Sequence, residues 1–229
     1  MEPGNDSLRL RIDSLRERVG RASERASRRP GSVTIVAVTK THPAETLQAL
    51  IDSGIQNIGE NRVQEIEGKA PLLKGDFSLH MVGHLQSNKA GRILQYVKWI
   101  HSVDREKLAA RIESCHKGTE KVAALVEVNT TGEASKSGCA PQECRNLCER
   151  VRRSSALEFR GLMTVGPLQG GEKAARESFS LLRRLGEECR DLADPFELSM
   201  GMSGDFEWAV EEGSTMIRVG TALLGERQR

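Results

Sequence analysis

The sequence predicts an α/β protein, built as a single (β/α)8 barrel of the TIM type with an extra helix in front of it. Three observations lead to this fold class. About eight apolar, strand-like runs alternate with helical stretches along the 229 residues. The opening run, 33–38, is continuous and rich in β-branched residues, which is typical of a strand buried on both faces of a parallel sheet. Two turns rich in small residues stand near the C-terminus, where such barrels keep phosphate sites. An open, doubly wound sheet is the alternative.

Residues 1–29 are expected to form a leading amphipathic helix that ends before Pro30. Apolar side chains recur there at three- and four-residue spacing, namely Leu8, Ile12, Leu15, Val19, Ala22 and Ala26. The opposite face carries arginines interleaved with acidic residues. A basic helix can touch RNA or anionic lipid, but a solvated face with ion pairs between residues four apart is the simpler explanation. We therefore expect no nucleic-acid partner.

The barrel is expected to occupy 33–229 as one domain. Strands are predicted at 33–38, 55–59, 79–83, 99–103, 122–128, 159–164, 197–200 and 216–219, and helices at 44–53, 62–73, 89–96, 105–117, 142–153, 173–192 and 205–212. In a parallel barrel the carboxyl ends of all strands meet at one mouth. Polar residues follow the predicted strands and are expected to converge there: Lys40, Glu60, Asn61, His84, Ser102, Asp104, Asn129, Thr164, Ser203 and Thr221.

Charge and composition limit the expected partners. The net charge of +2 gives no general reason to expect a nucleic acid or a membrane as partner. No apolar run is long enough to span a bilayer and the N-terminus is unlike a signal peptide, so we expect a cytoplasmic protein. The five cysteines are expected to be reduced thiols. Cys144 and Cys148 lie one helical turn apart without the further partners of a zinc site, and no metal site is predicted.

Two stretches near the C-terminus pass from an apolar run into small residues that can open a helix, at 198–205 and at 216–222. Gly201, Ser203 and Gly204 let the backbone approach a ligand closely, and Ser203 or Gly204 can cap the helix that follows. Gly220 and Thr221 repeat this design at the next turn. Each turn alone is an ordinary strand-to-helix connection. Side by side, with free amide donors and a hydroxyl each, they predict a receptor for a phosphate group.

Lys40 stands at the tip of the first predicted strand. At a barrel mouth a lysine loses hydration, which favours the neutral amine that forms an imine with a carbonyl. A lysine at a strand end is by itself more often a solvated surface residue. Across the mouth from a phosphate receptor, however, it predicts a ligand with an aldehyde at one end and a phosphate at the other. Pyridoxal 5′-phosphate (PLP) fits this description, and a phosphosugar whose carbonyl reacts with Lys40 is an alternative.

Seven segments carry a family resemblance: AVTKTHP at 37–43, IGENRVQE at 58–65, HMVGHLQSNK at 80–89, KSG at 136–138, GLM at 161–163, LSMGMS at 198–203 and GSTMIRVGTA at 213–222. In this order they resemble the YggS/PROSC family of PLP homeostasis proteins. The second, third and sixth segments together are highly specific. The resemblance extends from about residue 33 to the C-terminus, so the role of the leading helix is the least defined by it.

The resemblance implies a fold like the N-terminal barrel domain of alanine racemase, with PLP held as a Schiff base on Lys40. It implies further cofactor contacts from Asn61, Met200, Ser203, Arg218, Gly220 and Thr221. Ser203, Gly220 and Thr221 would hold the phosphate, Arg218 would lie near the pyridine nitrogen and Asn61 beside the ring. The family buffers PLP, so PLP-dependent apo-enzymes are the implied partners and a monomer is the implied state.

An arginine opposite the pyridine nitrogen disfavours most PLP chemistry. A proton on that nitrogen would cost on the order of 4 kcal/mol at ~4 Å from a guanidinium and an effective dielectric of about 20. A neutral ring is a poorer electron sink. Racemases with such an arginine recruit a tyrosine from an added β domain, which is not expected here, and Tyr96 is predicted to lie in a helix away from the mouth. His42 or His84 could act as a base. We expect a carrier without substantial turnover and no catalytic residue; a small PLP-dependent racemase is the alternative.

Overall fold

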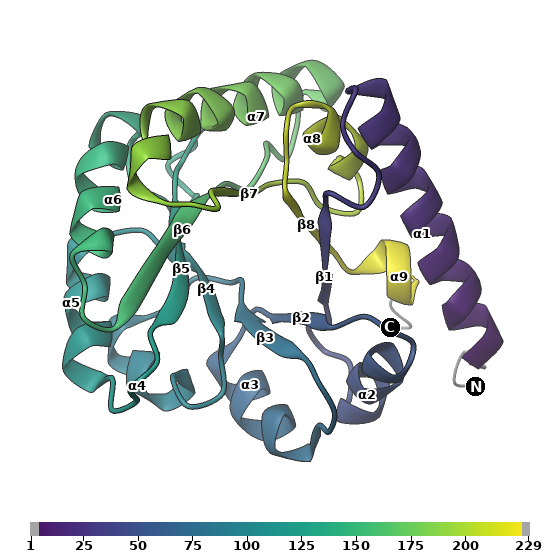
Figure 1. The fold of residues 1–229 in the computed structure, drawn as a ribbon, viewed down its shortest axis with the longest axis horizontal. Helices are drawn as coiled ribbons and strands as arrows, with labels where there is room; N and C mark the ends of the chain where they lie inside the picture. Colours follow the sequence, from purple (N-terminus) through teal and green to yellow (C-terminus); the bar gives the residue numbers. More distant parts are fainter. Residues whose placement is uncertain (1–4, 226–229) are drawn as a thin grey trace.

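Parallel strands close into a barrel in a computed structural model of the chain, which describes residues 5–225 (Figure 1). Each strand pairs with the next one along the chain, and the first pairs with the last, so that the sheet has no edge. The strands are β1 (Thr34–Val38), β2 (Asn57–Glu60), β3 (Ser78–Met81), β4 (Trp99–Val103), β5 (Val122–Glu127), β6 (Leu157–Met163), β7 (Glu197–Ser199) and β8 (Met216–Val219). The predicted fold class is confirmed.

Helices surround the barrel (Figure 1). They are α2 (Ala44–Asp52), α3 (Val63–Lys69), α4 (Ala90–Ile93), α5 (Glu106–Cys115), α6 (Cys144–Arg152), α7 (Gly171–Glu188), α8 (Phe206–Glu211) and α9 (Thr221–Leu224), with single 3-10 turns at η1 (Ala70–Leu72), η2 (Ser87–Lys89), η3 (Pro141–Glu143) and η4 (Arg190–Leu192). Several predicted helices were too long because their ends are 3-10 turns. The largest correction falls at 89–96, where α4 stops at Ile93 and Tyr96 lies in a turn. The helix ends early because the Lys98 amide must reach the Leu79 carbonyl to start β4.

The leading helix α1 (Asn5–Arg25) packs against α8 and α9 on the outside of the barrel (Figure 1). Its predicted apolar face is buried, as shown by Leu8, Ile12, Leu15, Val19 and Ala22. Its arginines make the predicted pair within the helix, Arg21 with Glu17 at 2.5 Å. They also reach α8, where Arg18 lies 3.2 Å from Glu207 and Arg25 lies 2.6 Å from Glu211. The charged face therefore fastens this helix to the barrel.

The interior of the barrel differs from the layer between strands and helices. The main apolar cluster joins helix residues such as Leu47, Leu50 and Ile66 to outward-facing strand residues such as Ala37 and Ile58. Two small apolar clusters stand apart from it, formed by Val36, Val38 and Val82 and by Leu125, Met163 and Met216. Fully or almost fully buried polar residues fill the strand positions between them, namely His80, His101, Ser199 and Arg218. This polar interior leads to the mouth of the barrel.

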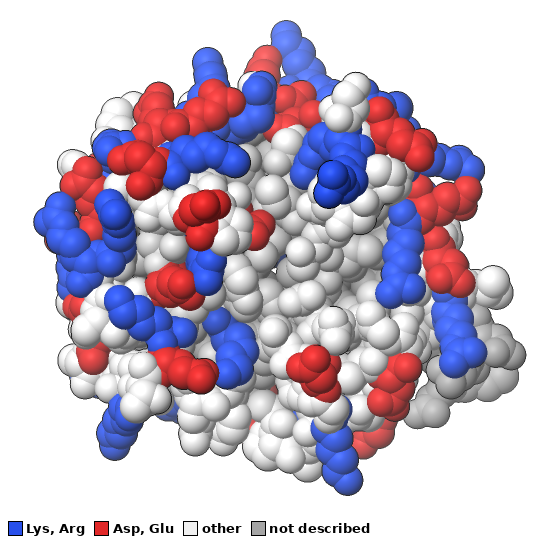
Figure 2. Space-filling view, in the orientation of Figure 1, with Lys and Arg blue, Asp and Glu red and all other residues white. Residues whose placement is uncertain are grey.

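Charges of both signs are mixed on the surface. Figure 2 shows Lys and Arg side chains interspersed with Asp and Glu around the rim of one face, while other residue types occupy most of its centre. Within residues 5–225, no helix combines the length and the apolar character that crossing a membrane requires.

Candidate functional site

A cavity of about 910 Å³ opens where the strands end, at the mouth of the barrel. The predicted site residues Lys40, Asn61, Ser203, Arg218, Gly220 and Thr221 all line it. Met200, which was also predicted to bind the ligand, is fully buried in the main apolar core and does not line the cavity. The first strand and the last two turns therefore share one opening.

The turn that carries Lys40 is held by buried and partly buried charges from the next β/α unit. Thr41 has a φ of +71°, which is an unusual conformation for a β-branched residue, and its amide donates to Glu65 Oε2 at 2.8 Å. Lys69 Nζ lies 2.7 Å from carboxylate oxygens of both Glu60 and Glu65 and donates to the Thr39 carbonyl. Burial raises the pKa of Glu60 to about 7, against the pull of the Lys69 ammonium. This network fixes the direction in which the chain leaves β1.

Two lysines line the cavity, and their surroundings differ. Lys136 Nζ lies 2.8 Å from Glu133 Oε1 and donates to the carbonyls of Gly166 at 2.6 Å and Val165 at 3.5 Å. Lys40 Nζ donates to no atom of residues 5–225. Because no described protein group holds its Nζ, Lys40 is the lysine of the cavity that is free to reach a ligand.

Ser203 joins the two C-terminal turns. Its Oγ accepts the amides of Gly220 at 3.1 Å and Ala222 at 3.2 Å. The sequence predicted that Ser203 or Gly204 would cap the helix directly after it. That prediction was wrong, because the hydroxyl instead serves the start of α9, across the mouth. Having accepted two amides, this hydroxyl keeps its own hydrogen for a ligand.

Arg218 on β8 is only 5% exposed and is held by main-chain and side-chain oxygens. Its guanidinium donates to Ser199 O and Oγ and to Thr164 O, each at 2.7 Å. Burial lowers the pKa of Arg218 to about 10, while the charges of Glu127 and Asp205 act in the opposite direction. The guanidinium is therefore charged at neutral pH and fixed in orientation.

A chain of hydrogen bonds continues from Arg218 through the barrel interior. Arg218 donates to Ser199 Oγ, which lies 3.0 Å from His101 Nδ1. His101 Nε2 lies 2.9 Å from His80 Nδ1, and His80 Nε2 lies 3.1 Å from Asn57 Oδ1. Burial lowers the pKa of His80 to about 3 and that of His101 well below its ordinary value. Two neutral imidazoles that each donate from Nε2 satisfy every link, so the chain is ordered in one direction.

Glu127, at the end of β5, lines the cavity and was not predicted as a site residue. Its Oε2 is buried and has no hydrogen-bond partner within residues 5–225. Burial and the negative charge of Asp104 raise the pKa of Glu127 to about 7, although the charge of Arg218 lowers it. The signal in the sequence was an acidic residue inside the otherwise apolar run 122–128.

Close packing at the ends of β2 and β3 positions Asn61 and His84. A Cβ on Gly83 would lie 2.4 Å from the Asn61 carbonyl oxygen, so only glycine allows this approach. Ser102 Oγ donates to the Gly83 carbonyl at 2.7 Å. His84 lines the cavity, with Nδ1 3.1 Å from Ser137 Oγ. Ser102 thus supports the mouth without lining it.

Not every polar residue that follows a strand reaches the cavity. Glu60, Ser102, Asp104, Asn129 and Thr164 were expected at the mouth and do not line the cavity. Asn129 holds its own loop through the Glu133 carbonyl, and Thr164 Oγ1 donates to the Val128 carbonyl. Conversely, the structure adds lining residues that were not assigned to the site: Val38, Val82, Gly83, Glu127, Lys136, Ser137, Val165 and Met202.

A family model and several known proteins match nearly the whole chain. The family model described as "Alanine racemase, N-terminal domain" matches residues 10–228. A protein of Pseudomonas aeruginosa named pyridoxal phosphate homeostasis protein is 41% identical over 219 residues, which cover 94% of each chain. A human protein of the same name is 37% identical over 234 residues, which cover 94% of this chain and 85% of the human one.

Solved structures show the same likeness. PipY of Synechococcus elongatus with PLP bound superposes with a TM-score of 0.81 at 34% identity, covering 95% of this chain and all of PipY. Alanine racemase from Corynebacterium glutamicum superposes with a TM-score of 0.67 at 14% identity, covering 93% of this chain and 60% of the racemase. The second likeness shows the fold alone.

Proposed function

The chain belongs to the family of pyridoxal phosphate homeostasis proteins, and from this premise we propose that it binds PLP through Lys40 and buffers it without substantial catalysis. One observation carries the proposal: Lys40, Ser203, Gly220 and Thr221 line the same cavity. Bound PLP supplies an aldehyde that condenses with a primary amine, and Lys40 is the uncommitted amine of the cavity.

The cavity has the donors that a phosphate group needs. The amides of Gly204 and Thr221 and the Thr221 hydroxyl donate to no atom of residues 5–225. The Ser203 hydroxyl has a hydrogen to add. A Cβ on Gly220 would lie 3.0 Å from the Val38 carbonyl oxygen, so glycine keeps this turn close to β1. The volume of about 910 Å³ lies within the ~300–1,000 Å³ range of small-molecule sites. The residues present therefore fit PLP.

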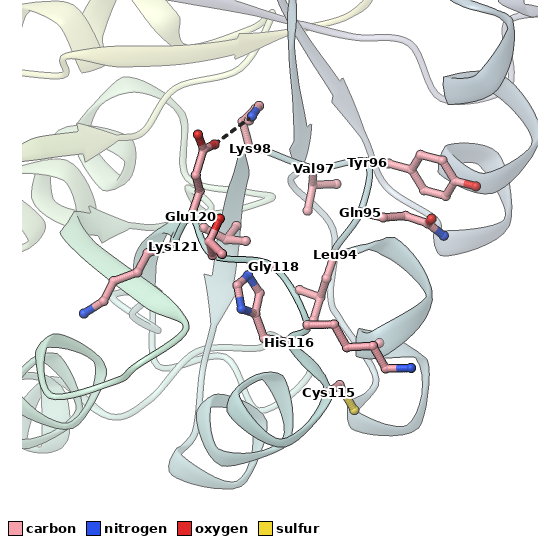
Figure 3. Close-up of a pocket in the computed structure, with 14 residues that line it drawn as sticks. Leu94, Gln95, Tyr96, Val97, Lys98, Cys115, His116, Gly118, Glu120 and Lys121 are labelled. Atoms are coloured by element: carbon pink, nitrogen blue, oxygen red, sulfur yellow. Dashed lines mark hydrogen bonds and ion pairs between the residues drawn. The ribbon is translucent and has the colours of Figure 1, made fainter.

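Arg218 supports the interpretation that the protein carries PLP without substantial catalysis. Its guanidinium is charged at neutral pH and is held by three hydrogen bonds. If PLP binds with its ring nitrogen toward Arg218, this fixed cation would oppose a proton at that atom, and it has no proton of its own to deliver. The single tyrosine of the chain, Tyr96, lines a different cavity before β4 (Figure 3).

Borohydride reduction followed by peptide mapping tests the attachment. The protein is loaded with PLP, reduced and digested, and the modified peptide is identified by mass spectrometry. We expect the label on Lys40 and its loss in Lys40→Ala. Lys136→Met is the matched control, because Lys136 lines the same cavity but is bound to Glu133 and two carbonyls. A label on Lys136 would overturn the proposal.

We further propose that the protein hands PLP to apo-enzymes and acts as a cytoplasmic monomer. The site supports hand-over because Thr221 is exposed and Lys40 is partly exposed, so that an incoming amine could enter and displace the Lys40 amine from PLP. Mixing the loaded protein with a PLP-dependent apo-enzyme, with free PLP trapped, measures transfer directly. Native mass spectrometry measures the oligomeric state.

A PLP-dependent racemase is the second candidate, and His84 is the observation that favours it. This imidazole lines the cavity and lies 3.4 Å from Asp104 Oδ2, so it can accept a proton and share the resulting charge. Incubation with L- and D-alanine in D2O measures Cα exchange. We expect no stereospecific exchange above that of free PLP. Exchange that His84→Ala abolishes would establish the racemase.

A further inference from the structure

Three of the five cysteines converge on the outer side of the barrel. Cys144 and Cys148 lie one turn apart on α6, and their Sγ atoms are 4.0 Å from each other. Cys189 follows α7, and its Sγ lies within 4.8 Å of both. Sequence spacing showed two thiols without partners, whereas the fold supplies a third from the end of α7.

The spacing of these sulfur atoms suits a metal ion better than a disulfide. Four thiolates around zinc, each at ~2.3 Å, stand about 3.8 Å apart at the corners of a tetrahedron. The Cys144–Cys148 separation of 4.0 Å is close to this value. A disulfide requires ~2.05 Å between sulfurs, so the Sγ atoms of Cys144 and Cys148 would have to approach each other by about 2 Å. We propose that Cys144, Cys148 and Cys189 form a three-thiolate binding site for Zn²⁺.

The surroundings meet the other requirements of such a site. All three residues are buried, with exposures of 1% or less. Arg145, next to Cys144 on α6, lies 3.0 Å from Asp191, two residues after Cys189, and so holds the two segments together beside the thiols.

The bound ion would tie two segments together. Cys144 and Cys148 lie on α6, and Cys189 directly follows the last residue of α7. Zinc would therefore fasten α6 to the end of α7. This role is independent of PLP binding.

Cobalt substitution tests the site, because tetrahedral Co²⁺–thiolate centres have distinctive visible and near-ultraviolet bands. The full-length protein is reduced, stripped with a chelator and titrated with Co²⁺, and then Zn²⁺ is added to displace it. We expect one equivalent to bind. Cys148→Ser and Cys189→Ser should each weaken Co²⁺ binding by more than about 100-fold, exceeding the effect of losing an outer partner.

Cys115→Ser is the matched control, since Cys115 lies in the separate cavity before β5 (Figure 3) and should leave binding unchanged. Cys139→Ser should also leave Co²⁺ binding in place, because Cys139 lies outside the group of three thiols. Cys148→Ala replaces the serine variant if thermal unfolding shows that the serine disturbs the metal-free fold. The proposal is overturned if the reduced protein binds neither metal at micromolar concentration. It is equally overturned if binding survives both Cys148→Ser and Cys189→Ser.

Discussion

The two ends of the barrel each carry a cavity lined by lysine, histidine and glycine, yet only one is built as a site. The mouth cavity has about 910 Å³, and the cavity at the opposite end, before β4 and β5, has about 630 Å³ (Figure 3). At the opposite end Lys98 and Glu120 pair at 3.5 Å while 65% and 85% exposed. At the mouth Arg218 and Glu127 are almost fully buried.

The difference lies in what burial demands of a polar group. An exposed ion pair is solvated by water and contributes little to stability, so nothing fixes its geometry. A buried guanidinium is tolerated only with its hydrogen bonds made, and Arg218 makes three. The mouth is therefore stiff before any ligand arrives, which is the condition for placing a reactive amine opposite a phosphate receptor.

The largest contrast is expected for the buried and the exposed cation. Arg218→Leu leaves the oxygens of Ser199 and Thr164 without their donor and Glu127 without its nearby positive charge. We expect a loss of about 3–5 kcal/mol in the free energy of unfolding, measured by urea denaturation. Lys98→Leu, at the opposite end, should change it by less than about 0.5 kcal/mol. Equal losses would remove the distinction between the two ends.

A pH-dependent contrast is expected for the two glutamates. The pKa of Glu127 is raised to about 7 in the folded protein from an ordinary value of 4.5, so the folded state binds the extra proton between these values. Its contribution to stability is therefore present below about pH 4.5 and is lost as the pH rises through 7, by roughly 3 kcal/mol at most. Relative to Glu127→Gln, the wild type should lose stability between pH 5 and pH 8. Glu120→Gln should leave the pH profile unchanged.

Adding one methyl group should also affect stability and PLP binding differently at the two ends of the barrel. Gly83→Ala places a Cβ 2.4 Å from the Asn61 carbonyl oxygen, whereas Gly118→Ala meets only the His116 ring at 3.3 Å and the Glu120 carbonyl at 3.9 Å. We expect Gly83→Ala to lower the free energy of unfolding by about 1–3 kcal/mol and to weaken PLP binding by displacing Asn61. Gly118→Ala should change neither stability nor PLP affinity. Thermal unfolding measures the first and a PLP titration the second.

The smallest effect is expected from a single hydroxyl. Ser203→Ala removes the acceptor of the Gly220 and Ala222 amides and the hydrogen offered to a phosphate. The stability loss should be about 1 kcal/mol, because water can reach these amides, and PLP affinity should fall about tenfold. Thr119→Ala at the opposite end is the control and should change neither. An unchanged PLP affinity in Ser203→Ala would place the phosphate elsewhere in the cavity.

The fold and most of the site could be predicted from the sequence because both follow from local patterns. Apolar runs and helical periodicity place each strand, and parallel strands bring residues that follow them, such as Lys40 and Ser203, to one mouth. Glu127 was not predicted, since one acidic residue in an apolar strand does not reveal which way its side chain points. The partners of the Ser203 hydroxyl were predicted wrongly, because the Gly220 amide that it accepts lies seventeen positions further along the chain.

The sequence by itself determined the order of the strands, the buried face of α1 and the placement of Lys40, Asn61, Ser203, Gly220 and Thr221 at the mouth, because each depends on the spacing of neighbouring residues. Only the tertiary structure decided which lysine of the cavity is free, since Lys136 is engaged by groups from two loops. It also decided that His101 and His80 continue the hydrogen bonds of Arg218, and that Cys189 lies beside Cys144 and Cys148. Burial and hydrogen-bond partners arise from contacts between distant segments, and no local pattern encodes them.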